Sequence, residues 1–197
     1  MSSLFSLVRI DSGVVVKGGK ELDLRHVQDS VSAGIAMLSE DRRRYGNIPM
    51  RSVMENTSLS SLKNFFFGGR HHTVKEKETV GEFFIKMNVK TPSLETPMKS
   101  LSGGNQQKVL LSRWMIRDPD VLILDEPTRG IDVGAKFEIY KLMMEVAKAG
   151  KGIIMVSSEM GELIGMCDRI YVMCAGHVSG ELARKDFSQE TMEHWKL

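Results

Sequence analysis

Apolar residues in the C-terminal half of the chain form short unbroken runs separated by stretches with helical spacing. The runs are Val121–Leu124, Ile153–Val156 and Ile170–Met173, and between the first two the apolar positions of residues 137–147 suit one face of a helix. An unbroken apolar run of this length is typical of a strand buried on both faces of a parallel sheet. Such strands alternating with helices predict a three-layer α/β domain.

The N-terminal half shows a weaker version of the same alternation. Val14–Val16 followed by Gly18-Gly19 predicts a short hairpin, and Ile35–Leu38 predicts a buried strand. Residues 64–73 combine aromatic residues, glycines and histidines, which predicts a loop. The remaining expected elements are a strand over 178–182 and helices over 27–33, 52–62, 74–87, 106–116 and 159–166.

Composition narrows the class of protein without naming a function. The chain has 197 residues, of which 42% are hydrophobic and 26% charged, as expected of one globular domain. Its net charge of +2 gives no indication of nucleic-acid binding. No apolar run approaches the roughly 20 residues that cross a bilayer, and the first residues do not suggest a signal peptide. Cys167 and Cys174 have no metal-ligand spacing, so we expect reduced thiols in a cytosolic protein.

Two adjacent carboxylates follow the most apolar of the predicted strands. Asp125 and Glu126 come directly after Val121–Leu124, at the end of a parallel sheet where ligands bind in open α/β folds. One carboxylate in such a place can hold Mg²⁺ together with phosphate oxygens, and the next can orient and deprotonate a water for phosphoryl transfer. An acidic turn with no chemical role also fits these two residues.

A second candidate site lies at the start of the helix before that strand. This segment is Leu101–Lys108. Its serine and two glycines, Ser102 to Gly104, place a hydroxyl and unbonded backbone N–H groups at the positive end of a helix dipole. Such a helix start is suited to binding an anion. A flexible linker that ends in an ordinary serine N-cap is the alternative.

Together these segments resemble the motifs of one family. Leu101–Lys108 resembles the signature motif of ABC ATPases, Val121–Pro127 resembles their Walker B segment, and Thr128–Asp132 resembles the D-loop that follows. The asparagine-glutamine-glutamine-lysine ending of the signature is similar to bacterial monosaccharide importers of the ribose, galactose and xylose type. The ATP-binding subunit of those importers carries two such domains in tandem. The resemblance extends to Glu40–Arg42 and Ser157–Glu159, and so covers nearly the whole chain.

The resemblance implies a fold, two cofactors and a role for each motif. The fold is a P-loop NTPase-like ABC ATPase domain in which residues 1–48 and 118–197 form the α/β core and residues 49–117 form an inserted helical subdomain. The cofactors are ATP and Mg²⁺. The resemblance implies Glu126 as the catalytic base, with Asp125 and more weakly Glu40 at Mg²⁺. It also implies contacts with an ATP held by the partner domain, made by Ser102, Gly103, Gly104 and Gln106. Asp132 would belong to the D-loop, and Ser158 stands where a switch histidine usually stands.

The sequence departs from the family pattern where ATP would be held. The closest approach to G-x-x-x-x-G-K-[ST] is Gly13–Lys20, in which the lysine comes one position late and Glu21 replaces the serine or threonine. The resemblance places the true loop before Met1 and makes Leu4–Leu7 the helix that follows it. Glu40 and Ser158 replace the usual glutamine and histidine, as in the second, degenerate domain of the tandem importers. We therefore expect the C-terminal domain, beginning after its Walker A loop, and no ATP turnover by the isolated chain.

The resemblance also implies partners and a location. The expected partners are a second ABC nucleotide-binding domain, membrane permease subunits and, indirectly, an extracytoplasmic sugar-binding protein, at the inner face of the cell membrane. A non-catalytic module that only binds a complete ATPase or a permease is the alternative. Residues 42–44 suit either a phosphate contact or a solvated basic turn, and Phe65–Phe67 with His71-His72 suit either a permease contact or a local cluster.

Overall fold

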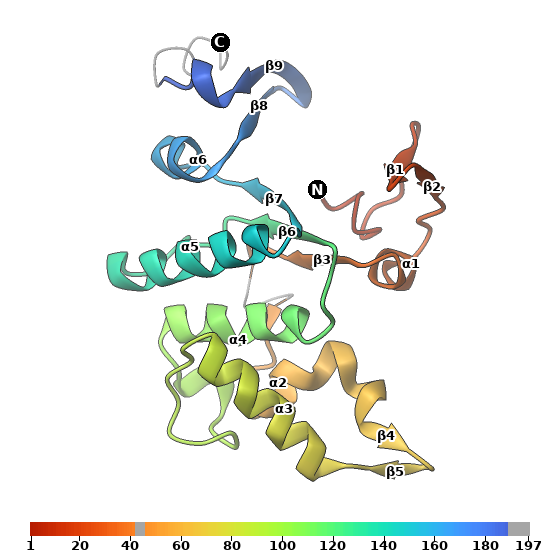
Figure 1. Ribbon diagram of the computed structural model, residues 1–197, viewed down its shortest axis with the longest axis vertical. Coiled ribbons are helices and arrows are strands. Elements are labelled where there is room, and N and C mark those ends of the chain that lie inside the picture. The colour runs from red at the N-terminus through yellow and green to blue at the C-terminus, as the bar shows by residue number, and fades with distance from the viewer. Residues whose placement is uncertain (42–45, 189–197) are drawn as a thin grey trace. The chain divides into compact units, whose positions relative to one another are not determined.

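The computed structural model describes residues 1–41 and 46–188 (Figure 1). It consists of two compact units, Met1–Ile154 and Met155–Leu197, which are described separately below. The basic stretch 42–44 lies outside the described residues. Among the residues described, no helix has the length and apolar character needed to cross a membrane. The division into a core and a helical subdomain that the resemblance implies stays a prediction.

A three-stranded sheet forms the centre of the first unit. Its strands are β3 (Ile35–Leu38), β6 (Val121–Asp125) and β7 (Gly152–Val156), in the order β3-β6-β7. The boundary of the first unit falls within β7, after Ile154. β3 and β6 are parallel, with Ile35 opposite Val121. All four residues of β3 are buried, as expected for a strand covered on both faces. The apolar runs are therefore confirmed as strands, but full burial holds only for β3 and the middle of β6, since β7 is half-buried and the run 170–173 alternates between buried and exposed residues.

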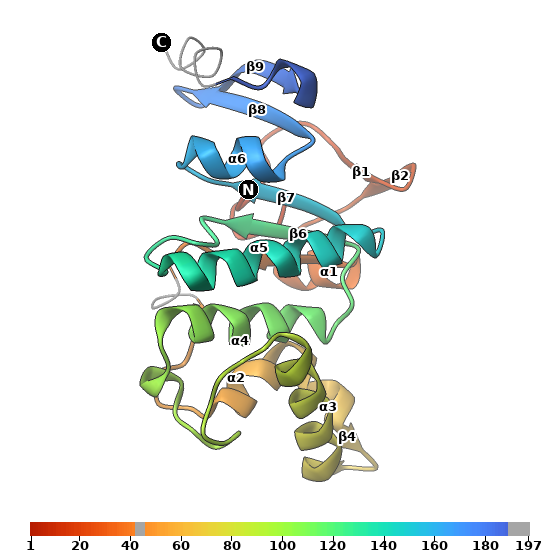
Figure 2. The same ribbon diagram turned by 60° about the vertical axis from the view of Figure 1, so that its left-hand side comes forward.

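Helices cover both faces of this sheet. On one face, Ile35, Met37 and Ile123 form a core with Phe5 and with side chains of α1 (Val27–Ser32). α5 (Val133–Lys148) lies on the side of β6 opposite α1 (Figure 2). Side chains of a strand alternate between faces, so one apolar run serves both layers.

The expected helix over residues 4–7 is a turn instead. Leu4 N donates to Met1 O at 3.0 Å and Leu7 N donates to Ser2 O at 2.9 Å, while Ser6 has a φ of 58°. A left-handed serine ends right-handed helical backbone, so the segment makes one turn only. Its role is packing, because Phe5 is buried and meets the Trp114 ring edge-on at 5.5 Å.

The predicted hairpin near the N-terminus is present. β1 (Val15–Lys17) and β2 (Lys20–Leu22) pair antiparallel around Gly18 and Gly19, whose φ values are 57° and 77°. Glycine accepts these angles without steric cost, which explains the turn. The segment Gly13–Lys20 is thus a hairpin and not a loop around phosphate.

A group of helices forms the rest of the first unit. It comprises α2 (Val53–Ser58), a 3₁₀ helix (Leu59–Phe65), α3 (Thr73–Lys86) and α4 (Gly103–Met115). The single helix expected over 52–62 was wrong in its second half, where Ser61 has non-helical angles and its hydroxyl donates to Ser58 O.

The expected loop over 64–73 contains a small hairpin. β4 (Phe66–Phe67) and β5 (Arg70–His71) pair antiparallel around Gly68-Gly69. Strands of two residues have no period that a pattern could reveal, so the sequence predicted only a loop.

The second unit is built on a hairpin. β8 (Arg169–Cys174) pairs antiparallel with β9 (His177–Ala183), and α6 (Met160–Met166) precedes them. Ile170, Val172 and Leu182 are buried against side chains that include Leu163 of α6. Cys167 and Cys174 form no disulfide in the part of the chain that the structure describes, and burial raises the pKa of Cys167 above its ordinary value.

Candidate functional site

Helix α4 is capped by Ser102 and begins with two glycines, Gly103 and Gly104. Ser102 Oγ accepts hydrogen bonds from Asn105 N at 3.5 Å and from Asn105 Nδ2 at 3.0 Å. Gln106 Nε2 donates to Leu101 O at 3.0 Å, and Leu101 itself is buried. These bonds fix the residue before the helix and its first turn. Ser102 remains exposed to solvent at the positive end of the helix dipole.

The start of α5 lies directly against the start of α4. Asp132 caps α5, because its Oδ1 accepts from Ala135 N at 3.0 Å. A Cβ atom built on Gly104 would lie 2.6 Å from the Cβ of Ala135 and 3.5 Å from Cγ2 of Ile131. The first distance is too short for two carbon atoms, so only glycine allows the two helices to approach this closely.

The two helix starts enclose a groove of about 280 Å³. Three predicted site residues, Ser102, Gly104 and Asp132, line it together, although they belong to two separate motifs. The sequence analysis missed the other polar residues of its wall, which are Lys90, Asn105, Lys108 and Glu138. Lys108 could have been identified from the sequence, because it is the last residue of the signature-like segment. No sequence feature marks Lys90 or Glu138 as part of the site.

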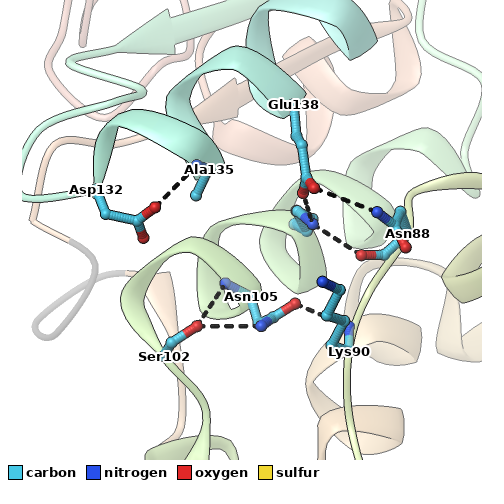
Figure 3. A network of polar contacts seen from close by, with 8 residues as sticks. Asn88, Lys90, Ser102, Asn105, Asp132, Ala135 and Glu138 are labelled. Carbon is cyan, nitrogen blue, oxygen red and sulfur yellow. Dashed lines mark hydrogen bonds and ion pairs between the residues drawn. The ribbon is translucent and has the colours of Figure 1, made fainter.

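A polar network in the wall of the groove joins α4, α5 and the segment after α3 (Figure 3). Lys108 of α4 is paired with Glu138 of α5 and donates to Asn88 O at 2.7 Å, just after α3. Asn88 Nδ2 in turn donates to Glu138 Oε1 at 3.3 Å. The Lys108 side chain is only 3% exposed, so these two acceptors replace its contact with water. Asn105 Oδ1 adds a further link by accepting from Lys90 N at 2.8 Å.

The carboxylate pair lies where the sequence predicted, at the end of β6. Asp125 is the last residue of the strand, and Glu126 has a φ of 47°, which is rare for a residue with a side chain. Burial raises the pKa of Asp125, and the negative charge of Glu126 raises it further, while the chain's amino terminus lowers it. A cation held there would favour the ionised form. A carboxylate and phosphate oxygens are the ligand set that Mg²⁺ uses, so Asp125 fits such a role.

The other predicted residues have different surroundings. Glu40 forms an ion pair with Arg129, so its carboxylate faces a guanidinium in this structure. Its assignment to Mg²⁺ stays a prediction. Ser158 belongs to the second unit and follows β7. Gln106 contacts Leu101 and also accepts from Asn47 Nδ2 at 3.3 Å.

A buried arginine that the sequence analysis did not single out ties α4 to α2. Arg113 Nε donates to Asn56 O at 2.6 Å and Arg113 Nη1 donates to Gly46 O at 2.6 Å. Burial lowers the pKa of Arg113 to about 10, so it remains charged at neutral pH. Its acceptors are carbonyl and amide oxygens, which satisfy the guanidinium and hold α4 in position.

Comparison with known proteins identifies the family to which this arrangement belongs. The ABC transporter family model matches residues 1–129. The chain belongs to the ABC transporter family. A xylose import ATP-binding protein of Photobacterium profundum is 50% identical to it over 179 residues, which is 91% of this chain and 35% of the relative. A galactose/methyl galactoside import ATP-binding protein of Clostridium tetani is 45% identical and covers 96% of this chain and 38% of the relative. The chain thus spans little more than a third of the length of these sugar-import relatives.

Solved structures of ABC ATPases share the fold. MJ1267, an ATP-binding cassette of an ABC transporter, has a TM-score of 0.81 at 15% identity and covers 100% of this chain and 81% of its own length. The cbiO1 protein of Clostridium perfringens, part of an ABC transporter complex, has a TM-score of 0.74 at 22% identity, with 99% and 74% covered. The predicted α/β ABC ATPase fold is therefore confirmed.

Proposed function

We propose that this chain is part of the ATP-binding component of a sugar importer and presents its signature helix to an ATP held by a second nucleotide-binding domain. The observation that carries the proposal is the exposed, capped start of α4 at Ser102, in a groove shared with the start of α5. The relatives, which are sugar import ATP-binding proteins, support the transported class. Which sugar is carried is left to the permease and the extracytoplasmic binding protein.

The proposed contact with ATP uses backbone groups rather than a cationic side chain. The N–H groups of Gly103 and Gly104 and the Ser102 hydroxyl would bind the γ-phosphate at the positive end of the 13-residue helix α4. Lys108 is engaged by Glu138 and Asn88 in the wall of the groove, so we assign the contact to the helix start rather than to this side chain. The contacts of Gln106 support a role in shaping the loop next to the phosphate rather than in binding it directly.

The carboxylates at the end of β6 would serve the chain's own nucleotide site. Asp125 would hold Mg²⁺ together with phosphate oxygens, and Glu126 would orient and deprotonate the attacking water. When bound, Mg²⁺ neutralises charge that develops on the phosphates. Asp132 would keep the D-loop in place through its cap on α5. The chain would act at the inner face of the cell membrane with permease subunits.

A non-catalytic role is the second candidate. Within this chain, the nearest approach to a phosphate loop is Gly13–Lys20, which forms a turn and hairpin in the structure. In that role the chain would bind a complete ATPase or a permease without affecting its turnover. The two candidates make opposite predictions for a bulky residue at the start of α4.

The test is Ser102→Arg in the transporter assembly that contains this chain, reconstituted in vesicles with its permease. An arginine there would fill the exposed helix start, so we expect ATP hydrolysis and sugar uptake to fall at least tenfold, as when about 1.4 kcal/mol of binding is lost. Ser100→Arg is the matched control, because Ser100 is exposed two residues earlier and should leave both rates unchanged. Unchanged turnover in Ser102→Arg would instead support the non-catalytic role.

A further inference from the structure

The hairpin formed by β4 and β5 exposes two neighbouring aromatic rings. Phe66 and Phe67 are each 48% exposed, and Val74 close by is 70% exposed. The hairpin projects from the helical region, at the end of α3 farthest from the sheet (Figure 1). We call residues 63–75 the aromatic hairpin. Adjacent exposed phenylalanines on a projecting tip are a common mark of an interaction site.

The charge of this segment has one sign. From residue 56 to residue 75 the sequence has no aspartate or glutamate, while Lys63, Arg70 and Lys75 are exposed. The first acidic residue that follows, Glu76, is 2% exposed, and its Oε2 lies 2.7 Å from Nε2 of His71. Its negative charge is therefore directed into the hairpin's base and away from the surface. The outer face combines aromatic rings with positive charge.

The exposed rings are held in fixed positions. Phe66 stacks on His71 with ring centroids 4.9 Å apart, and Phe67 meets His72 edge-on at 5.4 Å. Lys75 Nζ lies 4.5 Å from the centre of the Phe67 ring. At the base, His72 N donates to the carbonyl of buried Phe65 at 2.8 Å. Because the tip is already ordered, little conformational entropy is lost when it binds.

We propose that the aromatic hairpin binds the surface of a bilayer that contains anionic lipids. Phe66 and Phe67 would enter the headgroup region, where aromatic side chains are favoured, and Lys63, Arg70 and Lys75 would contact lipid phosphates. A projecting tip that combines aromatic rings with basic side chains and carries no carboxylate matches the polarity and the charge of the headgroup region of an anionic bilayer. This contact is independent of the proposed ATP-binding role.

The experiment is flotation of the purified chain with vesicles of phosphatidylcholine alone or mixed equally with phosphatidylglycerol. We expect binding to the anionic vesicles, weak binding to the neutral ones, and release as salt rises. Arg70→Glu should weaken binding roughly fivefold or more, because each basic residue at such a surface contributes about that factor. Lys99→Glu is the control for charge alone, since Lys99 is exposed outside the hairpin.

The aromatic contribution is tested separately. Phe66→Ser with Phe67→Ser should abolish flotation, whereas Ile85→Ser, at an 84% exposed position of α3, should not change it. Phe66→Trp provides a second measurement in case the serine variant fails to fold. This variant should still bind anionic vesicles, and the fluorescence of the new tryptophan should shift to the blue. Absence of flotation by the unaltered chain would overturn the proposal. So would binding that is unaffected by the serine pair, or binding only to lipid-free permease.

Discussion

The ion pair between Lys108 and Glu138 makes a quantitative prediction about stability. Lys108 is 3% exposed and Glu138 is 40% exposed, so the two ends of the pair differ in their access to water. Glu138→Leu would leave a buried ammonium with the Asn88 carbonyl as its remaining acceptor. Loss of one partner of a fully buried pair costs about 3–5 kcal/mol, and solvent at Glu138 reduces this to an expected cost of about 2 kcal/mol.

The reverse substitution should be milder. Lys108→Met removes the buried charge and keeps most of the side-chain volume, while Glu138 can turn to water. We expect a cost below about 1 kcal/mol. The double variant should then be close to Lys108→Met alone, since no buried charge remains to be compensated. This pattern corresponds to a coupling free energy of about 2 kcal/mol between the two side chains, which is the cost of Glu138→Leu.

Urea unfolding, followed by far-UV circular dichroism, measures these free energies of unfolding. The comparison requires that the dependence of the free energy on urea has the same slope in the unaltered chain and in the three variants. Glu145→Leu is the matched control, because Glu145 lies exposed on the same helix and should change stability by less than about 0.5 kcal/mol. The reasoning is refuted if Glu138→Leu costs no more than this control. It is also refuted if the double variant loses the sum of the two single costs.

Two further predictions concern the start of α4 and the end of β6. Gly104→Ala should lower stability by about 1–3 kcal/mol, because its Cβ would overlap Ala135, whereas Gly81→Ala, with open space around it in α3, should raise stability slightly in the same urea assay. Burial raises the pKa of Asp125, so its ionised form destabilises the folded state. Asp125→Asn should therefore raise the Tm at neutral pH, and a pH series of melting curves should show this gain disappearing below about pH 4.

Element type was predictable wherever a long apolar pattern existed, but the starts of the two helices that form the groove were not. α4 begins at Gly103 and α5 at Val133, several residues before the expected starts at 106 and 137. In both cases a capping side chain, Ser102 or Asp132, begins the helix before its first strongly apolar residue. Periodicity detects only the apolar face, so it places the start too late.

Only part of the groove between α4 and α5 was predictable from the sequence, and its assembly was not. Ser102, Gly104 and Asp132 each had a local signal, yet nothing in the sequence states that α4 and α5 begin side by side. In the sequence, Glu138 cannot be distinguished from other solvent-exposed residues of a helix. Only the structure shows that it is paired with Lys108. Pairs of this kind depend on the crossing of two helices, which is a property of the packed structure.

The contacts between α4 and α5 follow one stripe on each helix. Gly104 and Lys108 are four residues apart on α4, and Ala135 and Glu138 are three apart on α5, so each pair lies on one helical face. The close packing of Gly104 against Ala135 fixes the separation of the two helices. The ion pair between Lys108 and Glu138, one turn further along, opposes sliding of one helix past the other. Asp132 and Ser102 are the residues that precede these two faces. We therefore expect a displacement of the D-loop to move the start of α4 as well, because the two helix starts are packed directly against each other. Gly104→Ala should change the separation of the two helix starts more than Lys108→Met does.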